Sequence, residues 1–554
     1  MIPSFLDPRA RGVALGLAGL VLGVVLGGQL TREGYSVDEE FTLFAVRGIQ
    51  AYGLPLLPSH LLYDRGILYS YAAWLGGLVA APSLPTFRGI ACAAALGALL
   101  ALFSLVRTVA NGRAAILAVA LVSVSVPFVA VATTARFYAP FLLFYVLALR
   151  ALARQASSTR LTVPGAWGVA AVHERALPTT VALVSLFVLA LLARGTHELA
   201  FTLAGVPVAA FVFSSRRRRR AWAACTVALL AGLITAQLAL VAVHQWAPAP
   251  ARAAVSAATH DVSEPSMLTR FFVWQLVNLI EWPLDPLDFF VHILRLSPGL
   301  AFAVVLTLVL RIAGKGAPWS APQRFAHILW IGWVLLFGVI DSGITTNYLL
   351  VPVVLMLTAL AIDIAVLTPR AWFTPVALML LLSVSVEQWA GGPQPLTDGG
   401  RSFVAEASAR LDGARPTLTA PTGVSLPDLA TRADLVACTD ELACLLLAGR
   451  VDRWLALDDF LRTRFIVVRN GREQGVYAGS PVARTLPELF EVEAGQRPRD
   501  RVVVIDVFKD LPVGPSERFL VRALRDTPLP IRVILETSRL RVLEITRAAA
   551  GVPP

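Results

Sequence analysis

The chain has 554 residues, of which 56% are hydrophobic and only 15% are charged, and its formal net charge is +11. Soluble globular proteins carry about a quarter charged residues, so the composition excludes an ordinary soluble protein and favours a polytopic α-helical membrane protein. In a soluble chain the positive charge would indicate a nucleic-acid partner. Here much of it lies between apolar runs, as the positive-inside rule expects of cytoplasmic loops, so we expect no nucleic-acid partner.

Twelve apolar runs are long enough, or nearly so, to cross the hydrocarbon layer of a bilayer, which takes about 20 helical residues. They lie near residues 12–30, 67–81, 89–106, 114–132, 138–152, 176–193, 199–213, 221–243, 291–310, 325–340, 348–366 and 371–386.

The arginine-rich gaps between these runs, including RRRRR at residues 216–220, fix the predicted topology. If they face the cytoplasm, the other gaps and everything after Glu387 lie on the opposite side. An N-terminus inside and a C-terminus outside require an odd number of crossings, so one run does not cross. The short run 67–81, with Tyr69, Tyr71 and Trp74, is the one that we expect to lie at the interface or to be re-entrant.

The stretch YSVDEEFTLF, residues 35–44, places three acids directly after the first apolar run. Ser36 and Glu39 have the spacing of a capping box, so the acids could simply begin a helix. The apolar residues that follow have helical spacing and predict a helix lying on the membrane surface; they are Phe41, Phe44, Ala45, Ile49 and Tyr52. The alternative is that Asp38, at the water–lipid boundary, is a general base.

Other polar segments fall on the same side in this topology. They are SHLLYDRG with His60, Tyr63, Asp64 and Arg65; TTARFYAP with Arg136 and Tyr138; RGTHELAF with Arg194, His197 and Glu198; and DSGITTNYLL with Asp341, Asn347 and Tyr348. Any one of them could be an interfacial anchor, but together they indicate a polar site. The arginines suit bidentate phosphate binding. His197 and Glu198 could bind a divalent metal ion, although we favour hydrogen bonding as their role.

After Glu387 the turn-rich linker GGPQPLTDGG leads into a region of mixed charge. We expect a separate extracytoplasmic α/β domain of about 165 residues. RFIVVRNG and RVVVIDVF predict buried strands, DELACLLLAGRV and SERFLVRALRD predict helices, and RVILETSRLRVLEIT predicts a closing strand pair. An oxidising compartment would allow a disulfide between Cys438 and Cys444, but their spacing leaves this open.

Three segments carry a resemblance to a known family: VDEEFTLFAVRGIQAYGLPLLPS, TTARFYAPFLLFYVLAL and NYLLVPVVLML. With them, residues 1–390 resemble the GT-C superfamily of membrane glycosyltransferases, in particular the branch of protein O-mannosyltransferases and lipid A aminoarabinose transferases. The resemblance implies a GT-C-like domain with about 11–13 transmembrane helices over residues 1–390. Its first outward loop with the interfacial helix would be residues 31–66, and residues 391–554 would form the C-terminal domain.

The resemblance also implies an activity, which is inverting transfer of a hexosyl or pentosyl group from a polyprenyl-phosphate donor to an acceptor hydroxyl. The acceptor would be a lipid, glycan or protein at the outer face of a bacterial inner membrane, with the N-terminus cytoplasmic and the C-terminal domain periplasmic. By position, Asp38 matches the catalytic base and Glu39 its acidic neighbour. Arg136 and Tyr138 fall in a pocket-forming loop.

One family feature is missing, because the lysine and paired prolines that often open the second helix are replaced by LYDRGILY. Arg65 is the possible stand-in there. The remaining expected substrate-binding residues are His60, Tyr63, His197, Glu198 and Tyr348, and no metal ligand is assigned.

Two other classes of function remain open. A transporter or flippase of a lipid-linked or anionic substrate would use the charges as intramembrane sites, but such proteins usually show midplane charges and internal repeats, and the sequence shows neither. An accessory membrane protein would use the outward domain to bind a partner.

Overall fold

The computed structural model describes residues 39–158, 179–212, 216–246, 298–313, 320–340, 350–390, 425–456, 466–469, 472–490, 500–507, 530–536 and 540–546. The chain divides into two compact units. One contains Arg88–Leu240 and Pro265–Pro393, and the other joins Thr31–Phe87 to Gln394–Pro554. The first apolar run, Asp38, Tyr348 and the SERFLVRALRD segment lie outside the described residues.

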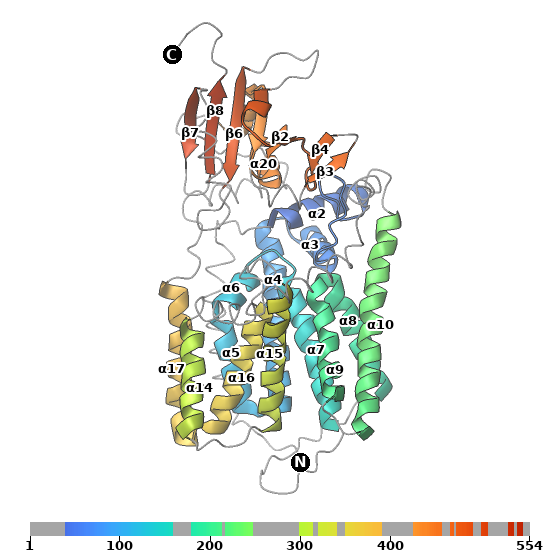
Figure 1. Ribbon diagram of the computed structural model, residues 1–554, viewed down its shortest axis with the longest axis vertical. Helices are drawn as coiled ribbons and strands as arrows, with labels where there is room; N and C mark the ends of the chain where they lie inside the picture. Colours follow the sequence, from blue (N-terminus) through green and yellow to red (C-terminus); the bar gives the residue numbers. More distant parts are fainter. Residues whose placement is uncertain are drawn as a thin grey trace. The chain divides into compact units, whose positions relative to one another are not determined.

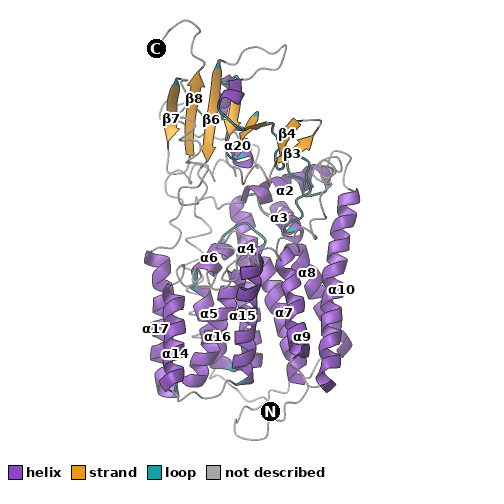
Figure 2. Ribbon diagram, in the orientation of Figure 1, coloured by secondary structure: helices purple, strands orange, loops and turns teal. Residues whose placement is uncertain are grey.

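The first unit is a bundle of helices (Figure 1; Figure 2). Its elements are α4 (Leu84–Val109, from Arg88 onward), α5 (Gly112–Ser123), α6 (Val126–Ala132), α7 (Tyr138–Ser158), α8 (Thr179–Thr196), η1 (Glu198–Phe201), α9 (Thr202–Val212), α10 (Arg216–Trp246), α14 (Pro298–Ala313), α15 (Ala321–Ile340), α16 (Leu350–Leu367) and α17 (Arg370–Ala390).

The core of this bundle is α16, in which every residue from Leu350 to Ile364 is buried. It packs against α5, α14 and α15. A helix that is apolar all round is buried on all sides, and this sequence fits that rule. In the described part of the chain, three helices are long and apolar enough to cross a membrane: Leu84–Val109, Arg219–Val243 and Leu350–Leu367.

Two details of the bundle differ from the sequence prediction. The single run expected over 114–132 is two helices, because the chain is extended at Ser125 and Pro127 then occupies the first turn of α6. Proline lacks an N–H group and is tolerated in a first turn, where that group has no partner within the helix. The arginines of RRRRR, expected in a loop, instead begin α10.

The N-terminal part of the second unit contains α2 (Glu39–Tyr52) and α3 (Ile67–Val79). The 13 residues of α3 span about 20 Å, less than the ~30 Å of hydrocarbon in a bilayer. Because α5 and α9, with 12 and 11 residues, are as short, the expectation that residues 67–81 are the run that does not cross stays a prediction. The helix predicted after the acids is present as α2. It is buried from Glu39 to Val46 and again at Gly48 and Ile49, because it packs against α3 and α20.

The C-terminal domain, residues 425–546, is the predicted α/β structure. Its six-stranded sheet has the order β5-β2-β1-β6-β8-β7, from β1 (Leu435–Cys438), β2 (Arg453–Leu455), β5 (Val482–Ala483), β6 (Arg501–Val507), β7 (Ile531–Glu536) and β8 (Leu540–Thr546). The pairs among β5, β2, β1 and β6 are parallel, and β6, β8 and β7 pair antiparallel, so the predicted closing strand pair is confirmed.

The remaining elements of this domain are α19 (Leu426–Arg432), α20 (Glu441–Ala448), η2 (Pro487–Phe490) and a separate hairpin of β3 (Ile466–Arg469) and β4 (Arg472–Gly475). One hydrophobic core includes side chains of α19 and α20, and a second includes side chains of η2. The strand expected in RFIVVRNG is present as β3, but its expected burial is wrong, because β3 lies outside the main sheet and leaves Val468 43% exposed.

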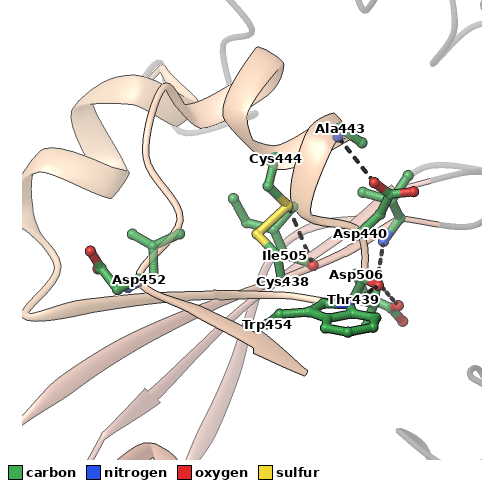
Figure 3. Close-up of a disulfide and its surroundings, with 11 residues drawn as sticks. Cys438, Thr439, Asp440, Ala443, Cys444, Asp452, Trp454, Ile505 and Asp506 are labelled. Atoms are coloured by element: carbon green, nitrogen blue, oxygen red, sulfur yellow. Dashed lines mark hydrogen bonds between the residues drawn. A yellow bond between two sulfur atoms is a disulfide. The ribbon is translucent and has the colours of Figure 1, made fainter. Parts of the chain in front are cut away.

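A disulfide joins Cys438 at the end of β1 to Cys444 in α20, with their Cα atoms 6.3 Å apart (Figure 3). Between the two cysteines the chain turns from strand to helix, and the Asp440 side chain caps α20 by accepting the N–H of Ala443. The disulfide therefore fixes the start of α20 to the sheet.

Candidate functional site

The acidic segment opens α2 with Glu39 and Glu40, whose side chains are fully buried. A buried carboxylate is costly unless hydrogen bonds or charges compensate it, and both residues have interactions inside the protein. The amino end of a helix favours negative charge, which is the local reason that acids are stable here. Two carboxylate side chains without solvent exposure in one helical turn are the first unusual feature of this chain.

The segment after α2 folds back as a tight hairpin, Leu54–Tyr63, called here the first-loop hairpin. Leu56 bridges Leu62, and the N–H of Leu57 donates to the carbonyl of Leu61. At its tip His60 has a φ of 63°, a left-handed conformation that is uncommon in residues with a side chain. The hairpin lies directly on α2 at Gly48, where a Cβ would come within 2.3 Å of the Leu56 backbone.

Of the residues predicted in this unit, Tyr63 contacts the acidic turn. Its ring stacks on Phe41 with 5.4 Å between centroids and 15° between planes, two residues after Glu39. His60 contacts Tyr52 at the far end of α2, and Arg65 is exposed.

Arg136 and Tyr138 of one predicted segment and His197 of another come together around Phe137 in the helix bundle. The Arg136 guanidinium lies 4.7 Å from the Phe137 ring centroid and 5.9 Å from that of Tyr138. The His197 ring lies 5.1 Å from Phe137, 5.6 Å from Tyr138 and 5.2 Å from Phe141. Arg136 and His197 are each 4% exposed. The result is a buried cation and an imidazole set among aromatic rings.

Local hydrogen bonds explain both placements. The turn between α6 and α7 is closed by the Arg136 N–H, which donates to the Thr134 carbonyl at 2.7 Å. His197 caps η1, because its Nδ1 accepts the N–H of Leu199 at 3.0 Å. In the neutral ring the proton is therefore on Nε2.

Arg194 lies at the end of α8, where it donates to the Gln237 side chain and stands 5.7 Å from the Phe201 ring centroid. Glu198 begins η1, but its side chain lies outside the described atoms, as do Asp38 and Tyr348 entirely. Within the described ranges, no group of three His, Cys, Asp or Glu residues is placed to hold a metal ion.

Sequence reasoning missed a polar cluster in the bundle around Asp363, which is 1% exposed. Its carboxylate faces Arg311 Nη2 at 3.2 Å, Gln323 Nε2 at 2.6 Å and His327 Nε2 at 2.8 Å. Trp330 Nε1 in turn donates to His327 Nδ1 at 2.9 Å. The sequence contained two signals for this cluster. An acid inside an apolar run needs a polar partner, and Gln323 and His327, four residues apart, lie on the same face of one helix.

Comparisons with known proteins show the fold. No protein-family model matches the sequence, and no curated protein matches it. The crystal structure of ArnT from Cupriavidus metallidurans bound to undecaprenyl phosphate is similar over 99% of this chain and 100% of that chain, with a TM-score of 0.53 and 15% identity. The chain has the GT-C fold.

Two more solved structures have this GT-C fold. The apo form of the same ArnT matches 97% of this chain and 98% of that chain, with a TM-score of 0.51 and 13% identity. Archaeal oligosaccharyltransferase AglB from Archaeoglobus fulgidus, in complex with an inhibitory peptide and a dolichol-phosphate, matches 89% of this chain and 69% of that chain, with a TM-score of 0.50 and 13% identity. The predicted fold class, a GT-C-like helical membrane domain followed by an α/β domain, is confirmed.

Proposed function

We propose that this protein is an inverting glycosyltransferase that moves a monosaccharide from a polyprenyl phosphate to an acceptor hydroxyl. The observation that carries the proposal is the pair of buried carboxylates opening α2 in a chain whose GT-C fold matches ArnT over its whole length. That ArnT is bound to undecaprenyl phosphate, and AglB to a dolichol-phosphate, so both carry a polyprenyl-type phosphate. That likeness supports a lipid-linked donor for this chain.

In the proposed reaction, Asp38 is the general base, directly before Glu39 in the sequence. Its carboxylate takes the proton of the acceptor hydroxyl while the hydroxyl oxygen attacks the anomeric carbon. The bond from that carbon to the phosphate oxygen breaks, and the polyprenyl phosphate leaves with the electron pair. Attack opposite the leaving group inverts the configuration at the sugar.

The leaving phosphate needs a cation, and Arg136 is the residue that we propose for it. Its guanidinium is nearly fully buried, so its charge is screened little by water and is worth more to a phosphate than that of an exposed arginine. Arg65, which is exposed, is the second candidate. Tyr63, His60, Tyr138, His197, Glu198 and Tyr348 are proposed to bind the donor or the acceptor.

The proposed location is the bacterial inner membrane, with the N-terminus cytoplasmic and the C-terminal domain periplasmic. The disulfide between Cys438 and Cys444 supports this orientation, because structural disulfides persist in oxidising compartments. A transporter is less well supported. In the Asp363 cluster, Arg311 is in the last turn of α14 and Gln323 in the first turn of α15, away from the middle of the helices.

The test uses the purified full-length protein in nanodiscs with a panel of undecaprenyl-phosphate monosaccharides and a membrane extract as acceptor. We expect one of these donors to release undecaprenyl phosphate with transfer of its sugar. Asp38→Asn is expected to slow transfer at least about 100-fold, as loss of a general base does. Glu33→Gln, an acid earlier in the same segment, is the matched control and keeps the wild-type rate. Full transfer by Asp38→Asn would sink the base assignment.

A further inference from the structure

A turn of the C-terminal domain, Val476–Ser480, is anchored at its base by a buried acid. Glu441, at the start of α20 and 5% exposed, accepts the Ser480 N–H at 3.1 Å and the Ala478 N–H at 3.4 Å. Gly475 lets this carboxylate approach, because a Cβ there would lie 2.2 Å from it. The turn is therefore fixed to the end of α20 that the disulfide holds against the sheet.

The other side of the turn contacts the first-loop hairpin in the same compact unit. The Ser59 hydroxyl donates to the Val476 carbonyl at 2.6 Å, and the Ser59 N–H donates to the Tyr477 carbonyl at 3.1 Å. Ser59 is at the hairpin tip and only 4% exposed. Through these two bonds, one residue of the hairpin donates to two successive carbonyl groups of the turn. They therefore fix the position of the turn along the hairpin.

The Tyr477 side chain reaches α2 itself. Its ring meets the Phe41 ring edge-on, with 4.8 Å between centroids and 81° between planes. Phe41 also stacks on Tyr63, so it is held by two rings, one from the hairpin and one from the C-terminal domain. Aromatic pairs in stacked or edge-on contact stabilise the structure beyond the area that they bury.

Phe41 lies in the first turn of α2, together with Glu39 and Glu40. A helix that is free to rotate about its axis turns all residues of one turn together, so holding the Phe41 ring also holds the direction of the two carboxylates. The hairpin fixes α2 at Gly48, in the second half of the helix. Tyr477 fixes the acidic end.

We propose that Tyr477, on the turn Val476–Ser480, is a positioning residue for the acidic first turn of α2. It acts through Phe41 and touches no reacting atom. The proposal deepens the proposed function and rests on it for the catalytic consequence, while the placement of α2 is measurable without turnover. The C-terminal domain is in this view part of the catalytic apparatus, because it sets the geometry of the acids.

The first experiment measures hydrogen exchange of the α2 amides in the full-length protein in nanodiscs. Tyr477→Ala is expected to speed exchange across Glu39–Tyr52 about 10-fold, and Tyr477→Phe, which keeps the ring, is expected to match the wild type. Phe490→Ala removes a ring that packs against the sheet core of the same domain and is the matched control. Unchanged exchange in Tyr477→Ala would overturn the proposal. Should that variant fail to fold, Ser59→Ala is measured instead, with an expected increase of about 3-fold and the same overturning result.

The second experiment measures transfer with the donor identified from the undecaprenyl-phosphate panel. Tyr477→Ala is expected to lower kcat about 10-fold with little change in the KM for the donor, because binding groups stay in place while the acids are misdirected. Tyr477→Phe restores the rate. A wild-type kcat in Tyr477→Ala overturns the positioning role. If Asp38→Asn retains transfer, the base assignment fails, and the exchange result still decides whether Tyr477 orders α2.

Discussion

The two units each bury a carboxylate, and they compensate it in different ways. In the helix bundle, Asp363 faces the side chains of Arg311, Gln323 and His327. In the C-terminal domain, Glu441 accepts backbone N–H groups of Ala478 and Ser480. One acid is balanced by a full positive charge, and the other by hydrogen bonds from the Ser480 side chain and from the N–H groups of Ala478 and Ser480.

The difference shows in the acid of the C-terminal domain. Burial raises the pKa of Glu441 to about 7, the hydrogen bonds from Ser480 and Ala478 oppose the rise, and the neighbouring charge of Asp440 adds to it. The hydrogen bonds from Ser480 and Ala478 therefore hold the carboxylate in place but do not fully compensate the hydration that it lost on burial. We expect the bundle acid to act as a fixed structural link, and Glu441 to make its domain sensitive to pH.

The largest expected effect comes from removing the Asp363 charge. Asp363→Asn leaves Arg311 and His327 facing a neutral amide, and breaking a buried ion pair from one side costs about 3–5 kcal/mol. Thermal unfolding in nanodiscs should show this as a large fall in Tm. Thr358→Val on the same helix removes a buried hydroxyl that bonds the Val354 carbonyl and is the matched control. If both variants melt alike, the cluster is not a structural link.

The second prediction concerns the pH dependence that Glu441 gives to stability. Its pKa is 4.5 unfolded and about 7 folded, so the folded state binds the proton more tightly. The stability from this group is complete below pH ~4.5, is lost as pH rises to about 7 and stays lost above, a total of roughly 3 kcal/mol at 1.36 kcal/mol per unit. Unfolding of wild type and Glu441→Gln at pH 5 to 8 measures it. The advantage of the wild type over the variant should shrink with rising pH, and a constant difference contradicts the assignment.

The third prediction, with a smaller expected effect, concerns the disulfide that joins β1 to α20, the helix that begins with Glu441. Replacing Cys438 and Cys444 together with Ser is expected to cost about 2 kcal/mol, the value for a short closed loop. The loss should appear in the Tm of the full-length protein. Labelling of whole cells with a membrane-impermeant thiol reagent, before and after reduction, checks orientation with the same pair. A domain in the cytoplasm would instead remain unlabelled by the impermeant reagent and would show free thiols, without reductant, only after the cells are lysed.

The smallest expected change is at Gly475. Gly475→Ala puts a methyl group against the Glu441 carboxylate, which must move away from the N–H groups that it accepts. We expect a loss of about 1–2 kcal/mol, the cost of disturbing a buried hydrogen bond. The variant should also blunt the pH dependence of stability if the carboxylate moves towards water. Stability and pH dependence equal to those of the wild type would contradict this prediction, because they would show that the turn moves to accommodate the methyl group without a cost in free energy.

The sequence predicted the features that have a local signal. The apolar run of α16 and the strand pair β7 and β8 are where periodicity placed them. The break at Ser125 and Pro127 also had a signal, since proline inside an apolar run marks a helix start, but run length alone hid it. Asp363 was visible as an acid in an apolar run, whereas its partners on two other helices were not.

The candidate site was predictable in part. Arg136 and Tyr138 were chosen from one segment and His197 from another, and the structure brings the two segments together at Phe137. The burial of α2 was not predictable, because its pattern of Phe41, Phe44 and Ile49 describes one apolar face and says nothing of a cover on the other. That cover comes from α20 and Tyr477, hundreds of residues later, and contacts at such distances leave no periodicity in the chain.

The bond between Ser59 and Val476 joins residues 417 positions apart. Ribosomes add about 5–20 residues per second, so roughly 20–80 s separate the synthesis of the acidic helix from that of the turn that covers it. During that interval the acids at the start of α2 have no Tyr477 to hold them. The order of synthesis therefore delays the ordering of the acidic first turn of α2 until nearly the whole polypeptide has been made.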